Sequence, residues 1–513
     1  MPSYRPLPLL LIATALAAAP AGASAAAPPP PGMISARDLA FLNRVTWGAN
    51  QADAEALVRD GRSRWLARQL QPAADDALPA AAQAQLDGLA ISHLKLKDEV
   101  QALEAQNKAA NQLTDPDQKK AAQQAYQQAM NDLARQAATR DLLRDLYAPD
   151  QVREQMTWFW FNHFNVHAAK ANIRAMVGDY EDSAIRPHAL GRFRDLLEAT
   201  LRHPAMLRYL DNADNAAGHI NENYARELLE LHTMGVGSGY SQKDVQELAR
   251  ILTGVGIDAR AEDPKVRPQM QDQLIRDGLF EFNPNRHDYG DKVLLGHTIK
   301  GRGFAEVEEA LDIIARQPAT ARHVSGQIAS YFMGDNPPPA LVGRMAETFQ
   351  HSDGDIAKVL ATLFQSPEFN ASLGTAFKDP AHYAVSAVRL AYNDRVILNA
   401  QPIQGWLNRM AEGLYNHETP DGYPVAAAAW DGPGQMAMRF EIARQIGAGA
   451  AGLFKPDTPG ATEAPAFPQI ENALYFNAIA PTMGPKSVAA LGQAVSPQDW
   501  NTLFLSSPEF MRR

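Results

Sequence analysis

The stretch that decides the fold is Val152-Arg-Glu-Gln-Met-Thr-Trp-Phe-Trp-Phe-Asn-His-Phe-Asn-Val-His167. Its middle, from Met156 to Phe164, is almost entirely apolar, so a helix formed here has no polar face. Such a helix is stable only inside a core, with other elements packed around it. The segment therefore predicts a helical protein organised about one central helix.

Helical patterns continue on both sides of this segment. Apolar residues recur at helical spacing over 37–72, and a helix over about 222–234 ends at Gly235. Ser241, with Asp244 three residues later, forms a capping-box pattern that begins the next helix. We predict a mainly α fold with N-terminal helices at 37–80, a multi-helix globular core at 141–375 and a C-terminal helical region at 376–513.

Residues 279–299 read as strands. Phe280 and Phe282 alternate with polar residues, Asn283 to Gly290 supplies turn residues, and Val293-Leu-Leu295 returns. The pattern predicts one small β-hairpin, which must lie against the helical core because two strands alone are marginally stable.

Residues 81–140 differ in composition, being rich in Ala, Gln and Lys. Apolar positions alternate by four and three from Leu89 through His93 to Leu103, and again from Tyr126 to Ala137, on either side of Thr114-Asp-Pro116. This spacing predicts an antiparallel helical-hairpin insertion with a coiled-coil seam. Two interpretations stay open, a tolerated insertion and an arm that docks a partner.

The first residues have the features of an export signal. Arg5 precedes an apolar run from Leu7 to Ala19, and Ala23-Ser-Ala25 fits a cleavage site. We expect a Sec-type signal peptide at 1–25, cleaved near Ala25, then a Pro-rich spacer at 26–36. The mature protein is expected to be periplasmic or secreted, and the absence of cysteine agrees with an oxidising compartment.

Composition and charge exclude several functions. A formal net charge of −10 argues against nucleic-acid binding, which needs Lys and Arg to neutralise phosphates. After the signal no long apolar run predicts a membrane span. Without cysteine, a divalent metal would need His, Asp, Glu or backbone oxygen as ligands.

The strongest candidate cluster joins the central helix to the helix over 222–234. His163 and His167 would share a face of a continuous helix, as would Glu227 and Glu230. These four are candidate ligands of a divalent metal, with Glu227 also a candidate catalytic residue. In the alternative interpretation Arg226 neutralises nearby glutamates, and His163 donates to a backbone carbonyl.

Other polar residues are candidates for chemistry or for structure. Arg226 and Asn223 are candidate substrate-binding residues. His287 and Asp288 could form a catalytic base with its orienting partner, or could simply serve the tight turn in which they lie. Arginines recur beside helix ends, and they could form buried pairs with nearby acids or line a cleft for an anionic substrate. The arginines are Arg153, Arg174, Arg186 and Arg226, and the acids include Glu154, Asp179 and Glu181.

Several motifs together carry a resemblance: Phe41-Leu-Asn-Arg-Val-Thr-Trp-Gly48, Trp158-Phe-Trp-Phe-Asn-His-Phe164, Glu222-Asn-Tyr-Ala-Arg-Glu-Leu-Leu-Glu-Leu-His232 and His287-Asp-Tyr-Gly290. The chain resembles the bacterial family of domain of unknown function 1800 over nearly its whole mature length. The resemblance implies an exported protein, often encoded beside a second exported, sulfatase-like protein, and implies no established activity. Asp421-Gly-Tyr-Pro424 stands where the family usually has a Gly-Trp-Pro element.

Two functional hypotheses follow. The first is a binding or assembly role with another exported, sulfatase-like protein, through the 81–140 hairpin. The second is metal-assisted hydrolysis at a site where His163, Glu227 and His287 converge between the core helices and the β-hairpin.

Overall fold

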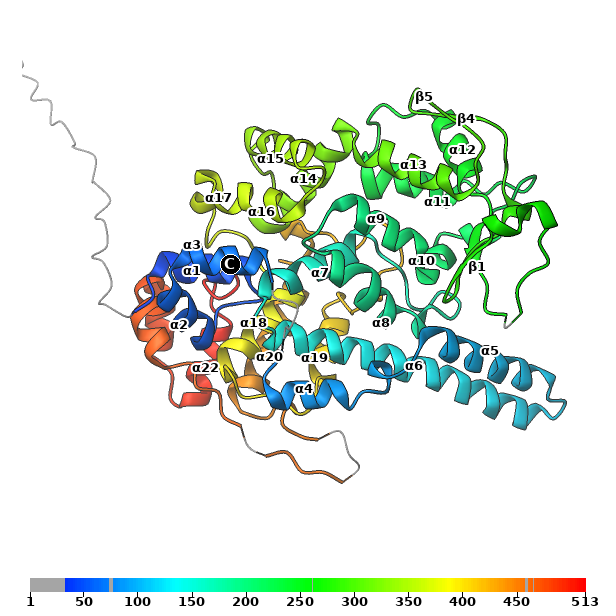
Figure 1. The fold of residues 1–513 in the computed structure, drawn as a ribbon. Helices are drawn as coiled ribbons and strands as arrows, with labels where there is room; N and C mark the ends of the chain where they lie inside the picture. Colours follow the sequence, from blue (N-terminus) through cyan, green and yellow to red (C-terminus); the bar gives the residue numbers. More distant parts are fainter. Residues whose placement is uncertain (1–32, 73–76, 261, 457–459, 465) are drawn as a thin grey trace, which may run out of the picture.

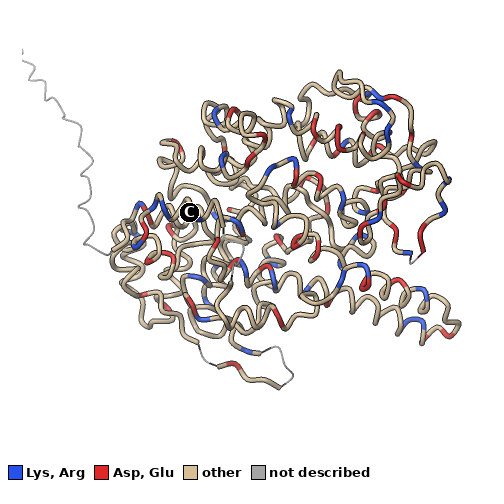
Figure 2. The backbone as a smooth tube through the Cα atoms, in the orientation of Figure 1, with Lys and Arg blue, Asp and Glu red and all other residues tan. Residues whose placement is uncertain are grey.

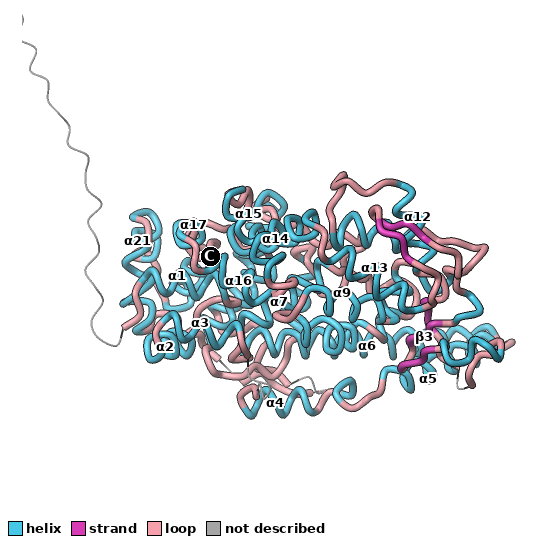
Figure 3. The backbone as a smooth tube through the Cα atoms, turned by 45° about the horizontal axis from the view of Figure 1, so that its top comes forward, coloured by secondary structure: helices cyan, strands magenta, loops and turns pink. Residues whose placement is uncertain are grey.

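The computed structural model describes residues 33–72, 77–260, 262–456, 460–464 and 466–513. The expected signal peptide and most of the spacer at 26–36 lie outside them. The described chain is mainly α-helical, as predicted, and its strands gather at one end of the molecule (Figure 3). Within the described residues no helix is both long and apolar enough to cross a bilayer.

Helices occur throughout the described chain. The N-terminal region contributes α1 (Ala36–Val45), α2 (Gln51–Asp60), α3 (Arg62–Leu70) and α4 (Ala80–Asp87). The long hairpin consists of α5 (Leu96–Gln112) and α6 (Pro116–Tyr147). The core contains α7 (Gln151–His163), α8 (Val177–Asp179), α9 (Phe193–Arg202), α10 (Pro204–Tyr209), α11 (Asn223–Glu227), α12 (Gln242–Ile251), α13 (Phe304–Ala315), α14 (Pro318–Met333), α15 (Pro339–His351), α16 (Ile356–Phe364) and α17 (Pro367–Ala371). The C-terminal region contains α18 (Pro380–Tyr392), α19 (Gln401–Arg409), α20 (Pro433–Gly447), α21 (Pro485–Leu491) and α22 (Pro497–Leu505).

Shorter helical segments connect these elements. Three are π-helical: η3 (Tyr180–Ile185), η6 (Leu228–Thr233) and η10 (Tyr475–Ile479). The 3-10 segments are η1 (Ala90–Ser92), η2 (Ile173–Ala175), η4 (Arg186–His188), η5 (Asn212–Asp214), η7 (Pro268–Gln273), η8 (Pro284–Arg286), η9 (Ala427–Ala429) and η11 (Ala480–Thr482).

Helix α7 is the central helix that its sequence predicts. Trp160 is fully buried, and its indole N–H donates to the Ala189 carbonyl over 2.9 Å, so its one polar atom is satisfied. Helices α1, α3 and α6 all contact α7, which Figure 1 places in the middle of the molecule. The apolar surface of α7 is thus covered by elements from distant parts of the chain.

The predicted helix boundaries around η6 and α12 are confirmed. Gly235 adopts a positive φ of 88°, as expected where a helix ends. The Ser241 hydroxyl accepts from the Asp244 N–H while the Asp244 carboxylate accepts from the Ser241 N–H, which completes the capping box.

The predicted pairing of strands is wrong. In one antiparallel sheet β3 (Phe280–Phe282) lies between β1 (Val255–Ile257) and β2 (Ile275–Asp277), and in the other β4 (Lys292–Leu294) pairs with β5 (His297–Ile299). Two-residue turns explain both hairpins, because Gly278 closes β2–β3 with φ 59° and Leu295-Gly296 closes β4–β5 with φ 50° and 81°. These short turns prevail over the long connection from Asn283 to Gly290.

The helical hairpin is confirmed with shifted boundaries. Leu103, Tyr126, Met130 and Leu133 form a small cluster separate from the main core. Leu89 and His93 lie outside α5, beside η1, and α6 runs past residue 140 to Tyr147 with its last turns buried. We call α5 and residues 116–136 of α6 the arm, which projects from the body in Figure 1.

Candidate functional site

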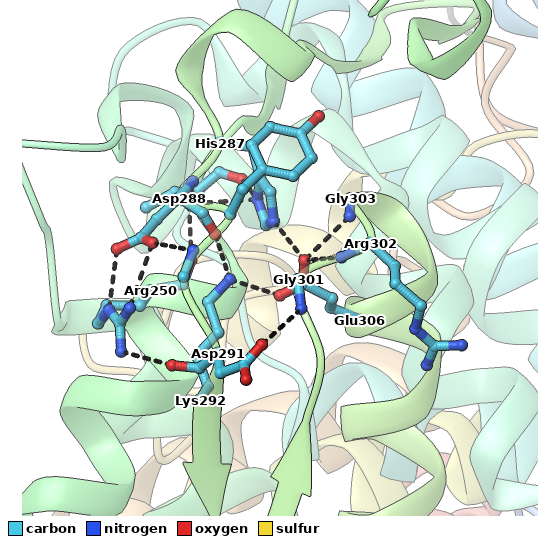
Figure 4. Close-up of polar contacts among 12 residues, drawn as sticks. Arg250, His287, Asp288, Asp291, Lys292, Gly301, Arg302, Gly303 and Glu306 are labelled. Carbon is cyan, nitrogen blue, oxygen red and sulfur yellow. Dashed lines mark hydrogen bonds and ion pairs between the residues drawn. The ribbon is translucent and has the colours of Figure 1, made fainter.

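The connection between β3 and α13 brings three polar side chains into one fully buried group. His287 Nε2 lies 2.9 Å from Glu306 Oε1, and the Lys292 ammonium donates to Glu306 Oε2. All three side chains have no exposed surface. Figure 4 shows His287 and Lys292 converging on the Glu306 carboxylate from different parts of the connection.

Both oxygens of the Glu306 carboxylate are hydrogen-bonded. Its Oε1 also accepts from the backbone N–H groups of Arg302 and Gly303, the latter over 2.9 Å. Burial by itself would raise the pKa of Glu306, but the hydrogen bonds from His287, Lys292 and Arg302 outweigh burial and hold that pKa below its usual value. The carboxylate therefore stays ionised and holds the connection onto α13.

His287 and Asp288 face different partners. The Nδ1 atom of His287 lies 2.7 Å from the Thr253 carbonyl oxygen, so both ring nitrogens of His287 are engaged. The Asp288 carboxylate accepts instead from the Arg250 guanidinium over 2.8 and 3.2 Å, and from Gly290 N–H. This geometry is that of a tight polar turn, and the two side chains do not form a His–Asp pair.

His163 meets two other histidines, not His167. Its ring centroid lies 6.0 Å from that of His232 and 6.2 Å from that of His323. Helix α7 ends at His163, and His167 lies in the turn beyond it. The expected shared helix face of His163 and His167 is therefore absent because the helix does not continue.

Two of these histidines satisfy carbonyl groups of the π-helical segment η6. His163 Nε2 lies 3.0 Å from the His232 carbonyl oxygen, and His323 Nε2 lies 3.1 Å from that of Leu231. An imidazole that bonds a carbonyl must donate, as the alternative interpretation of His163 predicts. Burial, only partly opposed by this hydrogen bond, lowers the pKa of His163 to about 3.

His232 is the unusual member of this group. Its side chain is fully buried, and neither ring nitrogen has a hydrogen-bond partner among the described residues. Burial, reinforced by His163 and His323, lowers the pKa of His232 well below its usual value. The ring is therefore neutral, because a buried imidazolium without a hydrogen-bond partner is strongly disfavoured.

The acidic residues at and around α11 and η6 form a half-buried ion-pair network with Arg226. Arg226 lies 3.2 Å from a Glu222 oxygen and 3.4 Å from a Glu230 oxygen, so it neutralises both. Glu227 is partly buried, and its pKa is raised by burial first and then by Glu230. Asn223 donates to the Leu210 carbonyl over 3.2 Å. The candidate substrate-binding residues thus already have partners within the protein.

The predicted site residues fall into three separate sets of contacts. His163 contacts His232 and His323, Glu227 faces Glu230 and Arg226, and His287 contacts Glu306 and Thr253. Among the described residues no three His, Asp or Glu side chains lie close enough to hold a metal ion.

Sequence reasoning missed a group of buried carboxylates beneath α7. Asp141 and Asp145 on α6 are almost fully buried beside Glu154 and Glu181, and burial followed by mutual repulsion raises the pKa of both aspartates. Burial also raises the pKa of Glu181 to about 7, although Tyr415 OH donates to it over 2.6 Å. No local pattern distinguishes these aspartates from a solvated helix face.

One buried ion pair lies in this region. The Arg186 guanidinium contacts both oxygens of Glu154, at 2.6 to 3.2 Å, and so forms one of the arginine–acid pairs that the sequence left unassigned. The pair fixes η4 against α7, and charge-assisted bonds of this kind are stronger than neutral ones.

Comparison with known proteins identifies a family. The family model described as "Protein of unknown function (DUF1800)" matches residues 40–512. No curated protein and no solved structure matches the chain.

Proposed function

The chain belongs to the DUF1800 family, which has no established function. From the surface of the protein itself we propose that it is an exported binding protein, and that it uses the arm to dock another exported protein. The single observation that carries this proposal is the projection of the arm away from the body in Figure 1. The signal sequence, the absence of cysteine and the resemblance described above support export.

The base of the arm is fixed to the body. Arg174 donates to Gln127 and Asn131 on α6, both over 2.6 Å, and Gln101 on α5 donates to the Ala259 carbonyl. Between Gln106 and Tyr126, by contrast, the hydrogen bonds of the described residues join only arm residues, such as Gln123 and Asn111. A fixed base with a free distal part presents a rigid surface, which lowers the entropic cost of binding.

The distal surface of the arm has a composition that suits a helical partner. Residues 121–131 contain no charged side chain. The exposed positions there are Ala121, Gln123, Gln124, Ala125 and Gln128, together with Gln127 and Asn131, whose side chains are held by Arg174 at the base of the arm. Elsewhere both signs of charge are interspersed over the body (Figure 2). Small methyl groups allow close approach of another helix, and the amides can hydrogen-bond without the desolvation cost of a charge.

The test shortens the arm by one heptad on each helix. Removal of residues 106–112 and 116–122 takes out the buried Ala110 but keeps the 113–115 turn and the register of the remaining inward-facing positions, because seven residues restore the same face. The partner to test is the exported sulfatase-like protein that the resemblance associates with this family. We expect at least tenfold weaker binding of the shortened protein in isothermal titration calorimetry.

Two substitution variants control for indirect effects. Ala121→Arg with Ala125→Arg places charges on the uncharged face without shortening it, and should weaken binding similarly. Val488→Arg changes an exposed side chain on α21, which Figure 3 places at the opposite end of the molecule from α5, and should leave binding unchanged. Equal affinity of the shortened and intact proteins would refute the docking role.

Metal-assisted hydrolysis, the second hypothesis from the sequence, stays a prediction without support from the site geometry. The Nε2 atom of His163 is hydrogen-bonded to the His232 carbonyl, and the Nε2 atom of His287 is hydrogen-bonded to the Glu306 carboxylate. Elemental analysis of protein purified from its native compartment tests it, and a metal stoichiometry near one that is lost in folded His163→Ala would revive it.

A further inference from the structure

A serine and a lysine meet on the wall of a cavity of about 500 Å³ at the other end of the molecule from the arm. The Lys378 Nζ atom lies 2.9 Å from the Ser386 hydroxyl oxygen, and both residues line the cavity. Each residue has only 3% of its surface exposed. A cavity of this size falls within the range of small-molecule sites in proteins.

The cavity is assembled from the two ends of the described chain. Lys378 lies two residues before α18 and Ser386 in the middle of that helix, Leu39 and Asn43 come from α1, and Phe510 from the segment after α22. Figure 1 shows the end of the chain beside α1. The remaining lining combines apolar side chains, including Leu373, Leu390, Ile479 and Phe504, with the charged residues Glu509, Arg512 and Arg513. A cavity with an apolar side and two buried reactive groups on its wall differs from the half-buried polar network at α11.

We propose that this cavity is a hydrolytic site in which Ser386 is the nucleophile and Lys378 its general base, acting on a carboxylic ester with a short apolar acyl group. This inference is independent of the arm. In the structure Lys378 Nζ donates to Ser386 Oγ over 2.9 Å, and the Ser386 hydroxyl donates to the Tyr383 carbonyl over 3.1 Å. With a neutral amine, rotation of the hydroxyl hydrogen from that carbonyl to Nζ gives the contact that proton transfer requires.

The surroundings of Lys378 favour the neutral amine that a base must be. Burial lowers the pKa of Lys378 well below its usual value, and the guanidinium groups of Arg439 and Arg513 lower it further, while Asp379 opposes them. His382, another titratable group nearby, is also held neutral by burial, with its pKa lowered to about 4. A lysine activated by burial beside other cations is a known route to a base near neutral pH.

The reaction balances with water as the second reactant. Lys378 takes the Ser386 hydroxyl proton while Oγ bonds to the ester carbonyl carbon, and the carbonyl π electrons move to oxygen. The C–O bond to the alcohol then breaks, and the alcohol leaves with the proton from Lys378. Water attacks the resulting acyl-Ser386 in the same way, which releases the acid and restores both residues. Asn43 also lines the cavity; its amide oxygen accepts from the Ala49 N–H over 2.9 Å, and its amide nitrogen is the type of donor an oxyanion needs.

The experiment measures hydrolysis of p-nitrophenyl butyrate by the full chain, together with covalent labelling by a fluorophosphonate. We expect turnover, labelling mapped to Ser386 by peptide mass, and loss of at least 100-fold in rate in Ser386→Ala and in Lys378→Met. Ser325→Ala, which removes a buried hydroxyl without a partner in the described structure and outside this cavity, should keep the wild-type rate.

Folding of each variant is checked by circular dichroism melting. Should Lys378→Met fail to fold, labelling of the wild-type protein at Ser386 still decides the proposal. Wild-type turnover no faster than that of folded Ser386→Ala, or a label on any other serine, would overturn it.

Discussion

The Nε2 atom of His163, at the end of α7, lies 3.0 Å from the carbonyl oxygen of His232 in η6. This bond ties together the two motifs that the sequence placed in one candidate site. His323 makes the equivalent bond to Leu231, so two imidazoles satisfy successive carbonyls of a π-helical segment. The predictions below test whether such buried polar groups serve the fold.

Replacing His163 should cost stability without any metal. His163→Phe keeps a flat ring but leaves the His232 carbonyl without its donor, and we expect a loss of about 1–3 kcal/mol in the free energy of unfolding. Urea unfolding at pH 7 measures it. His167→Ala, in the turn beyond α7, is the matched control, with an expected change within about 0.5 kcal/mol. Equal stability of His163→Phe and the wild type would contradict this role.

The histidine group should make the protein acid-sensitive. The pKa of His163 is about 3 when folded, against an ordinary 6.5, so the unfolded state binds more protons between these values. The free energy of unfolding therefore falls as pH drops from about 6.5 toward 3. His232→Phe removes one such group and should reduce this slope. Urea midpoints at pH 7, 6 and 5 provide the comparison, and an unchanged slope would argue against buried neutral imidazoles.

Glu181 should give the opposite pH dependence of stability. Its pKa of about 7 exceeds the ordinary 4.5, so the folded state keeps a proton that the unfolded state has lost. Stability should then fall as pH rises from about 4.5 to 7. Glu181→Gln keeps an acceptor for Tyr415 OH and should stabilise the protein more at pH 7.5 than at pH 5. A stabilisation that is the same at both values would refute the raised pKa.

The Glu306 network should contribute far more to the free energy of unfolding than a surface ion pair on the same helix. Glu306→Leu leaves Lys292 and His287 buried without their carboxylate, and we expect a loss of about 3–5 kcal/mol. Glu309→Leu breaks only the exposed contact with Arg302, and should change stability by about 1 kcal/mol or less. Thermal and urea unfolding of the two variants give the comparison. Similar losses of stability in both variants would mean that burial does not determine how much the Glu306 network stabilises the protein.

Two glycines test the turn that set the strand pairing. Gly296 closes β4–β5 with φ 81° and has open space around it, so Gly296→Ala should cost about 1–2 kcal/mol through backbone strain alone. Gly343 lies inside α15, also in open space, and Gly343→Ala should instead stabilise by about 1 kcal/mol. Equal effects of the two substitutions would exclude backbone conformation as the cause.

Local signals predicted elements well and pairings poorly. The apolar run in α7 and the capping box at Ser241 are encoded over a few residues, and both were predicted correctly. The hairpin β2–β3 was missed although Asp277-Gly278 is a turn signal, because Asn283 to Gly290 offered a longer set of turn residues. No sequence pattern indicated the contact between Lys378 and Ser386. Lys378 lies two residues before α18, and neither spacing nor composition shows that its side chain folds back along that helix to reach Ser386.

The sequence by itself determined that this chain is mainly helical, where its central helix and its arm lie, and which family it resembles, because periodicity, caps and motif order are properties of neighbouring residues. Only the tertiary structure decided which carbonyl each histidine meets, which carboxylates are buried under α7 and where a serine faces a lysine. Burial and distance between segments far apart in the chain set the charge and partners of those groups, and no local pattern specifies either.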